Sequence, residues 1–123
     1  MNALNLCESD YRFMSVVWDS APVSSGALVR LCQERLGWKR TTTYTVIKRL
    51  GQRGVLKNEN AVVTSLVSKD QVQAAEIDEL VEKKFGGSLP AFVAAFAKRQ
   101  DLSEAELNEV QHMIDRIRKG GAR

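Results

Sequence analysis

The segment "WKRTTTYTVIKRL", residues 38–50, decides how the chain is interpreted. Every residue from 41 to 47 is β-branched or aromatic, and this composition favours a strand. As a strand, however, the segment would have no cleanly apolar face. As a helix it places four side chains at positions i, i+3, i+4 and i+7 of one buried stripe: Thr43, Val46, Ile47 and Leu50. Propensity is a weak preference that packing overrides, so the periodicity predicts a helix from about Arg40 to Arg53, ended by Gly54.

The charge of the chain is concentrated around this segment. The formal net charge is only +3, but residues 39–57 hold six basic residues and no acid, whereas the flanks 1–38 and 58–123 carry −1 and −2. A solvated helix face usually mixes both signs. A single basic segment between near-neutral flanks is instead typical of a nucleic-acid contact.

The sequence on either side of residues 38–50 predicts the helices and strands that surround this segment. Upstream, apolar spacing and caps predict one helix over about Glu8–Asp19 and a second, capped by Ser24, that ends at Gly37. Downstream, 55–57 and 61–65 resemble two short strands joined by a turn at 58–60. Three helices followed by a hairpin is the order of a winged helix-turn-helix, in which the second helix of the pair enters the major groove.

The rest of the chain predicts three more helices. Ser68-Lys69-Asp70-Gln71 is a capping box that opens a helix to about Phe85, Ser88 caps a short helix, and a second capping box at 103–106 opens the last one. The predicted fold class is therefore mainly α with a small β-hairpin. Its predicted parts are a winged helix-turn-helix over 1–67, a helical dimerisation domain over 68–119 and a frayed tail over 120–123.

Three helices in about fifty residues make a poor independent core, since small domains bury too little surface. Their apolar stripes therefore predict a homodimer, and the alternative is that they fold back on the first domain of a monomer. The predicted interface consists of Leu80, Phe85, Leu89, Phe92, Val93, Phe96, Leu107, Val110, Ile114 and Ile117.

Composition excludes several classes of protein. No apolar run is long enough to span a bilayer, and residues 1–10 lack the pattern of a secretory signal, which predicts a cytoplasmic protein. The chain has two separated cysteines and one histidine, His112, so a structural zinc site is not expected and no cofactor is predicted. Without a Ser/His/Asp set or a phosphate-cradling glycine loop, an enzyme is not expected.

Double-stranded DNA is the predicted partner, and each residue of the basic segment has an expected role. Lys39, Arg40 and Arg49 are predicted phosphate contacts, although Arg49 has the alternative of bracing the wing through a salt bridge. Thr41, Thr42, Tyr44, Thr45 and Lys48 are predicted to face the groove. For Thr41 or Thr42 the alternative is local capping of the helix. A protein-interaction module whose basic face binds an acidic partner is the competing function.

Three stretches resemble the penicillinase-repressor family of bacterial transcription regulators: "ESDYRFMSVVWDSAPVSSGAL", "GWKRTTTYTVIKRLGQRGVL" and "FGGSLPAFVAAFAKRQDLSEAELNEV". The resemblance covers nearly the whole chain, and its most specific part is the Phe-Gly-Gly-Ser-Leu block followed by Asp-Leu-Ser-x-x-Glu. It implies a homodimeric winged-helix repressor that binds palindromic operators. It also implies release by a membrane-bound sensor protease, whose cut would fall between Ala95 and Phe96.

The chain departs from the family pattern at three places. The family bond usually has asparagine where this chain has Ala95. The wing, Lys57 to Ser65, is short and carries Glu59 at its tip, so only weak contact with the DNA backbone is expected from it. The predicted recognition helix carries Tyr44 on its open side. The cysteine pairs of a copper-responsive branch are missing from 118–123, so copper sensing is not predicted.

Overall fold

The computed structural model describes residues 3–99 and 101–120, and it divides inside one helix into a unit up to Leu80 and a unit from Val81. The first unit contains α1 (Glu8–Ser20), β1 (Val23–Ser24), α2 (Ser25–Leu36), α3 (Arg40–Gln52), β2 (Leu56–Glu59), β3 (Val62–Ser65) and most of α4 (Lys69–Lys84). The second contains the end of α4, α5 (Leu89–Ala97) and α6 (Glu104–Gly120). The predicted frayed tail began at residue 120, but Gly120 is the last residue of α6, and residues 121–123 lie outside the described residues.

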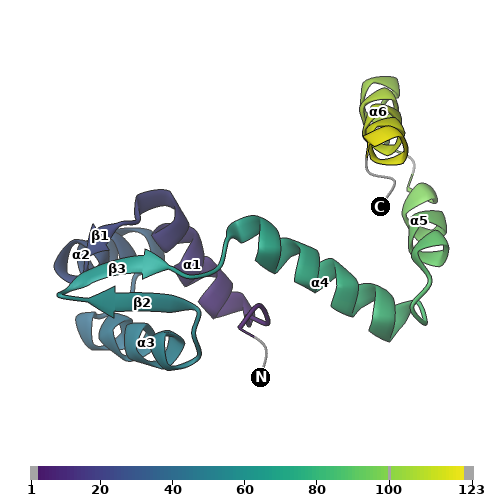
Figure 1. Cartoon of the computed structure of the whole chain (residues 1–123). Helices are drawn as coiled ribbons and strands as arrows, with labels where there is room; N and C mark the ends of the chain where they lie inside the picture. The colour runs from purple at the N-terminus through teal and green to yellow at the C-terminus, as the bar shows by residue number, and fades with distance from the viewer. Residues whose placement is uncertain (1–2, 100, 121–123) are drawn as a thin grey trace. The chain divides into compact units, whose positions relative to one another are not determined.

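The first unit is a winged helix-turn-helix. Helices α2 and α3 follow one another, and the hairpin of β2 and β3 comes directly after α3 (Figure 1). The three helices and the sheet enclose a single core, whose largest fully buried side chains include Phe13, Met14, Leu28, Leu50 and Leu56. The predicted fold class is confirmed.

The decisive segment is a helix, as its periodicity predicted. Thr43, Val46, Ile47 and Leu50 are all buried on one side of α3, and they pack where α1, α2 and the sheet meet. The helix ends at Gln52, and Gly54 follows with a φ of +80°, a conformation that strains any residue with a Cβ. The tertiary core therefore overrides the strand preference of seven consecutive β-branched or aromatic residues.

The wing differs from the prediction in its turn. Asn58 and Glu59 were predicted to turn but belong to β2, where they pair with Val63 and Val62 of β3. The reversal is made by two residues, Asn60 and Ala61, which both have positive φ, of 54° and 60°. Two consecutive left-handed residues suit a two-residue hairpin, because their twist matches that of the strands.

A third strand was not predicted. Val23 and Ser24 pair antiparallel with Val63 and Val62, so β3 is the central strand and the order is β1-β3-β2. Two residues are too few for an alternating pattern to be visible in the sequence. The strand ties the start of α2 to the wing, and its Ser24 also caps α2 by accepting a hydrogen bond from the Ala27 amide at 3.1 Å.

Both tryptophans, Trp18 and Trp38, are half-buried against the core of the first unit. The Trp18 indole of α1 donates to the Val67 carbonyl at 3.0 Å and to the Ser65 hydroxyl at 3.1 Å, where the chain leaves β3. The Trp38 ring stacks on Phe13, with a centroid distance of 5.6 Å and an interplanar angle of 4°. The tryptophans thus join α1 to the segments before and after α3.

The second unit is helical, and its helix starts follow the predicted caps. Ser103 and Glu106 form a reciprocal capping box at α6, and the Ser88 hydroxyl accepts from the Ala91 amide at the start of α5. At the start of α4 in the first unit, Ser68 and Gln71 pair in the same way. Among the described residues, no helix combines the length and apolarity that crossing a bilayer requires.

Candidate DNA-binding surface

The predicted groove-facing residues lie together on the open side of α3. Four of the five, Thr41, Thr42, Thr45 and Lys48, are exposed, and so are Lys39 and Arg40 at the start of the helix. The fifth, Tyr44, is half-buried because it also packs against the core. Since no acid occurs between residues 39 and 57, this face of α3 is uniformly basic or neutral.

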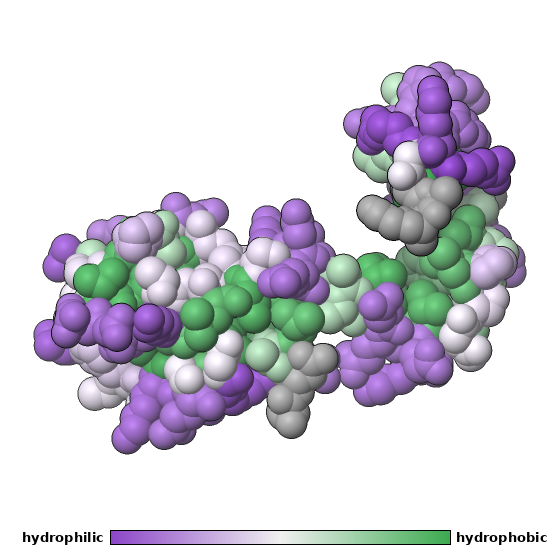
Figure 2. Space-filling view, in the orientation of Figure 1, coloured by the Kyte–Doolittle hydropathy of each residue, from purple (hydrophilic) through white to green (hydrophobic). Residues whose placement is uncertain are grey.

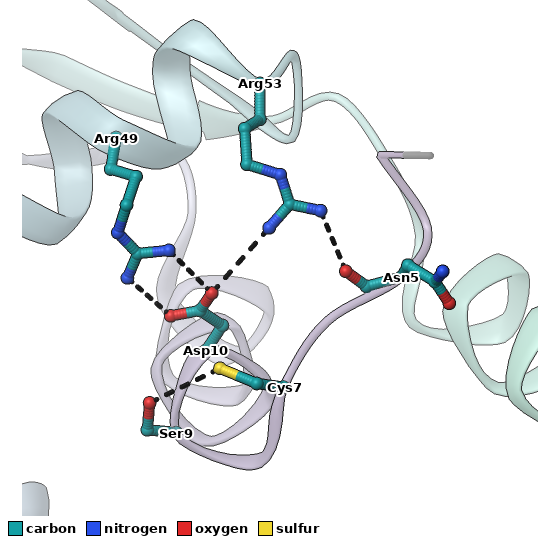
Figure 3. Close-up of polar contacts among 6 residues, drawn as sticks. All are labelled: Asn5, Cys7, Ser9, Asp10, Arg49 and Arg53. Atoms are coloured by element: carbon teal, nitrogen blue, oxygen red, sulfur yellow. Dashed lines mark hydrogen bonds and ion pairs between the residues drawn. The ribbon is translucent and has the colours of Figure 1, made fainter. Parts of the chain in front are cut away.

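Arg49 is positioned differently from these residues. Its guanidinium donates two hydrogen bonds to the two carboxylate oxygens of Asp10 on α1, each 2.8 Å long (Figure 3). The salt bridge that was considered for Arg49 therefore exists, but its partner is on α1 and not on the wing. The Arg49 side chain remains 45% exposed, so it lies at the edge of the surface. Its donor fork, the pair of N–H groups that can bind one acceptor group together, is already occupied by Asp10.

Asp10 was missed by the sequence analysis, although it organises one edge of α3. Its side chain is only 2% exposed and also lies 3.8 Å from the Arg53 guanidinium, which donates to the Asn5 carbonyl at 2.8 Å (Figure 3). The hydrogen bonds from Arg49 hold the pKa of the Asp10 carboxyl below its ordinary value despite its burial. They also raise the pKa of Arg49.

A signal for this role of Asp10 was present in the sequence. Asp10 stands at position i of the α1 stripe that continues at Phe13, Met14 and Val17, all of which are buried. An acid on an apolar stripe requires a cationic partner, because an unpaired buried carboxylate is strongly destabilising.

The threonines Thr41 and Thr42 do not cap α3. The N-cap residue is Lys39, and the helix start has no side-chain cap hydrogen bond. Only the buried Thr43 hydroxyl bonds back to the backbone, to the Lys39 carbonyl at 3.4 Å. The capping alternative is therefore wrong, and the hydroxyls of Thr41 and Thr42 face solvent.

The wing contributes little charge to this surface. The one cation of the hairpin, Lys57, pairs with Glu59 at 3.1 Å, and β2 and β3 contain no other charged residue. Between α3 and β2 lies an open groove of about 700 Å³, bordered by Tyr44 and Lys48 on one side and by Lys57 and Asn58 on the other.

Most of the apolar residues that were predicted to pair between two copies are exposed, and all but Leu80 belong to the second unit. Within α5 and α6, which the structure describes completely, no residue is buried. Eight of the ten predicted interface residues are exposed in the single chain: Leu80, Leu89, Val93, Phe96, Leu107, Val110, Ile114 and Ile117. The other two, Phe85 and Phe92, are half-buried against each other with ring centroids 5.5 Å apart. Figure 2 shows hydrophobic surface gathered over α5.

An apolar groove of about 380 Å³ separates α5 from α6. Val93 and Phe96 of α5 face Val110 and Met113 of α6 across it. The predicted cut between Ala95 and Phe96 falls in the last turn of α5, where both residues are exposed.

Comparisons with known proteins agree with this architecture. The sequence model described as penicillinase repressor matches residues 6–116. The methicillin resistance regulatory protein MecI of Staphylococcus aureus (strain Mu50 / ATCC 700699) is 23% identical over 90% of this chain and 94% of its own length. The penicillinase repressors of Staphylococcus aureus and Bacillus licheniformis are 24% and 18% identical, over 90% and 89% of this chain and 91% and 89% of their own lengths. With its winged helix-turn-helix and its C-terminal helices, the chain belongs to the penicillinase repressor family.

Proposed function

We propose that the protein is a transcriptional repressor that binds a palindromic DNA operator as a homodimer. Residues 1–67 form the DNA-binding domain of this proposal, and residues 68–119 form the dimerisation domain. The observation that carries it is the basic, acid-free face of α3, the second helix of a helix-turn-helix. In proteins of this architecture, that helix enters the major groove.

Phosphates supply affinity and base edges supply sequence preference, and the surface offers groups for both. Lys39 lies at the helix start, where the exposed backbone amides of the first turn also favour a phosphate. Lys48 lies one helical turn beyond Thr45 on the open side, in reach of the groove walls. Because Lys57 is paired with Glu59, the wing adds little to the electrostatic attraction.

The test is retention on duplex DNA at increasing salt. A repressor of this kind loses affinity steeply, with a slope of log affinity against log salt near −0.9 for each phosphate contact. Lys48→Ala should lower duplex affinity at every salt concentration. Arg12→Ala, which removes an exposed cation of α1 outside the basic segment, serves as the control and should change it little. If the wild-type chain is not retained by DNA but is retained by an acidic protein surface, the interaction-module alternative replaces the repressor.

The exposed apolar faces of α5 and α6 support the proposed homodimer. A soluble chain rarely leaves so many large apolar side chains uncovered on neighbouring helices. A second copy of the chain carries the same apolar faces, which can pack against those of the first. The two-fold symmetry of such a dimer corresponds to the symmetry of a palindromic operator.

Proteolytic release is the regulatory part of the proposal. A cut between Ala95 and Phe96 separates α6 from the rest of the chain, and with it about half of the proposed interface. A chain that ends at Ala95 should therefore behave as a monomer and bind a palindromic duplex much more weakly than the full chain. Undiminished binding by the shortened chain would exclude release by this cut.

A further inference from the structure

Arg40 and Tyr44 form a cation–π pair on the open side of α3. The Arg40 guanidinium carbon lies 5.5 Å from the centroid of the Tyr44 ring, within the range of a cation–π contact. The two residues are one helical turn apart, so their side chains are neighbours on the same face. The Tyr44 ring is itself anchored, because it packs against the core of the first unit. The core thus fixes the ring, and the ring fixes the guanidinium.

The Arg40 guanidinium keeps its N–H donors available. A cation–π contact with a ring engages the charge of the group and pairs none of its N–H donors with an acceptor oxygen. Among residues 3–99 and 101–120, no acid pairs with Arg40. Arg49, the other arginine predicted to touch DNA, has its fork occupied by Asp10. Of these two arginines, Arg40 is therefore the one able to make a new bidentate contact.

The position of the pair points to base edges rather than to the phosphate contact expected from the sequence. Arg40 is the first residue of α3, and residues at the start of a recognition helix contact base edges. An arginine in the major groove bonds to O6 and N7 of guanine in a bidentate manner. We propose that Arg40, held over the Tyr44 ring, reads a guanine in the major groove of each half-site. This inference rests on the proposed function and adds a specific base contact to it.

The first experiment selects preferred duplexes from a random pool with the full-length protein. The selected sites should contain a guanine at a fixed position in each half. Replacing that base pair should weaken binding of the wild-type chain by about 5- to 150-fold, the range for a good bidentate contact. For Arg40→Ala the same replacement should change affinity less than twofold.

Modified bases then locate the contact. 7-Deazaguanine lacks the N7 acceptor and should weaken the wild-type chain while leaving Arg40→Ala unaffected. Inosine keeps O6 and N7 but lacks the minor-groove amino group, so it should bind like guanine. If Arg40→Ala instead loses affinity equally at every sequence and reduces the salt slope by about one, Arg40 contacts a phosphate and the inference is overturned.

Substitutions of Tyr44 test the role of the ring. Tyr44→Phe keeps an aromatic face and should keep the preference for guanine. Tyr44→Leu keeps apolar packing but removes that face, so in the wild-type background it should lose most of the preference for guanine. Added to Arg40→Ala, the same substitution should cause no further loss of preference. Circular dichroism melts of each variant check that the domain remains folded. A full guanine preference in folded Tyr44→Leu would show that the contact between Arg40 and the ring has no role.

The outcomes separate the two proposals. If no duplex is enriched from the pool, both the repressor function and the guanine contact are excluded. If duplexes are enriched but none carries a guanine that depends on Arg40, the repressor function stands and this inference fails.

Discussion

Asp10 is the residue on which the position of α3 depends most directly. It is a nearly fully buried carboxylate that receives both donors of Arg49 and also attracts Arg53, so one acid on α1 holds two cations of α3 and its C-terminal end (Figure 3). Paired donors fix orientation as well as distance, because the two hydrogen bonds are parallel. Asp10 is thus a positioning residue for the proposed DNA-binding face.

We expect Asp10→Asn to destabilise the first unit. The substitution removes a charge that accepts two charge-assisted hydrogen bonds, each of a kind that contributes about 1.5–3 kcal/mol. Arg49 is about half exposed, so in the variant water can replace part of the lost hydrogen bonding of its guanidinium. We therefore expect the unfolding free energy, measured in urea titrations, to fall by only about 1–2 kcal/mol. Asp19→Asn is the matched control, since Asp19 pairs with Arg35 at 3.0 Å with both side chains exposed. Equal losses for the two variants would contradict a special role of Asp10.

The same carboxylate predicts how stability depends on pH. The pKa of Asp10 is lower in the folded protein than its ordinary value of 3.8, so its contribution is complete above that value and is lost as the pH falls through the lowered pKa. The difference in unfolding free energy between the wild-type chain and Asp10→Asn should therefore be constant from about pH 7 to 5 and shrink below about pH 4. Urea titrations across this range measure it, and a difference that grows on acidification would contradict the assignment.

Single residues also show where sequence reasoning stopped. Arg40 and Arg49 were given the same role as phosphate contacts because both lie in the acid-free segment. The structure distinguishes them through Asp10, which is 39 residues away from Arg49 in sequence. The apolar spacing around Asp10 could have indicated a buried acid, but nothing in the sequence said which of six cations would meet it.

At the scale of elements, α3 shows that packing decides between helix and strand. The spacing of its apolar residues was visible in the sequence, and so were the capping boxes of α4 and α6. The two-residue strand β1 was not, because its formation depends on β3, which lies 38 residues further along the chain. The turn at Asn60 and Ala61 was displaced because Ala61 is not a residue that usually marks a left-handed turn.

Two glycines give opposite predictions at this scale. Gly54, after α3, has a φ of +80° with no atom within 4 Å of an added Cβ, so only backbone strain opposes Gly54→Ala. That strain should reduce stability by about 1 kcal/mol or more. Gly26, in the first turn of α2, is equally uncrowded but helical, so Gly26→Ala should raise stability by about 0.5 kcal/mol. Thermal melts measure both, and a melting temperature raised by Gly54→Ala would contradict the strain.

At the scale of the whole molecule, the described residues of the second unit include no buried side chain, so they form no core of their own. The apolar residues of its predicted stripes lie on α5 and α6 and remain largely uncovered in the single chain. A sequence pattern identifies an apolar face, but it does not say which surface packs against that face. For that reason the predicted homodimer stays a prediction here.

We expect Ile114→Asp to convert a dimer into a monomer in sedimentation experiments. Ile114 lies on the exposed apolar stripe of α6, and a carboxylate there would be desolvated without a partner when two copies meet. His112→Asp is the control, because residue 112 lies on the opposite side of the helix, where a charge stays in water. A sedimentation mass unchanged by Ile114→Asp would remove this stripe from the interface.

The location of the two indoles has a practical consequence for spectroscopy. Trp18 and Trp38 both belong to the unit that ends at Leu80, and the chain has no other tryptophan. Intrinsic emission therefore reports only on the fold around α1, whereas far-ultraviolet ellipticity records every helix. Denaturation curves followed by the two signals will separate if the carboxyl-terminal helices melt first, so their coincidence is a direct readout of cooperativity along the chain.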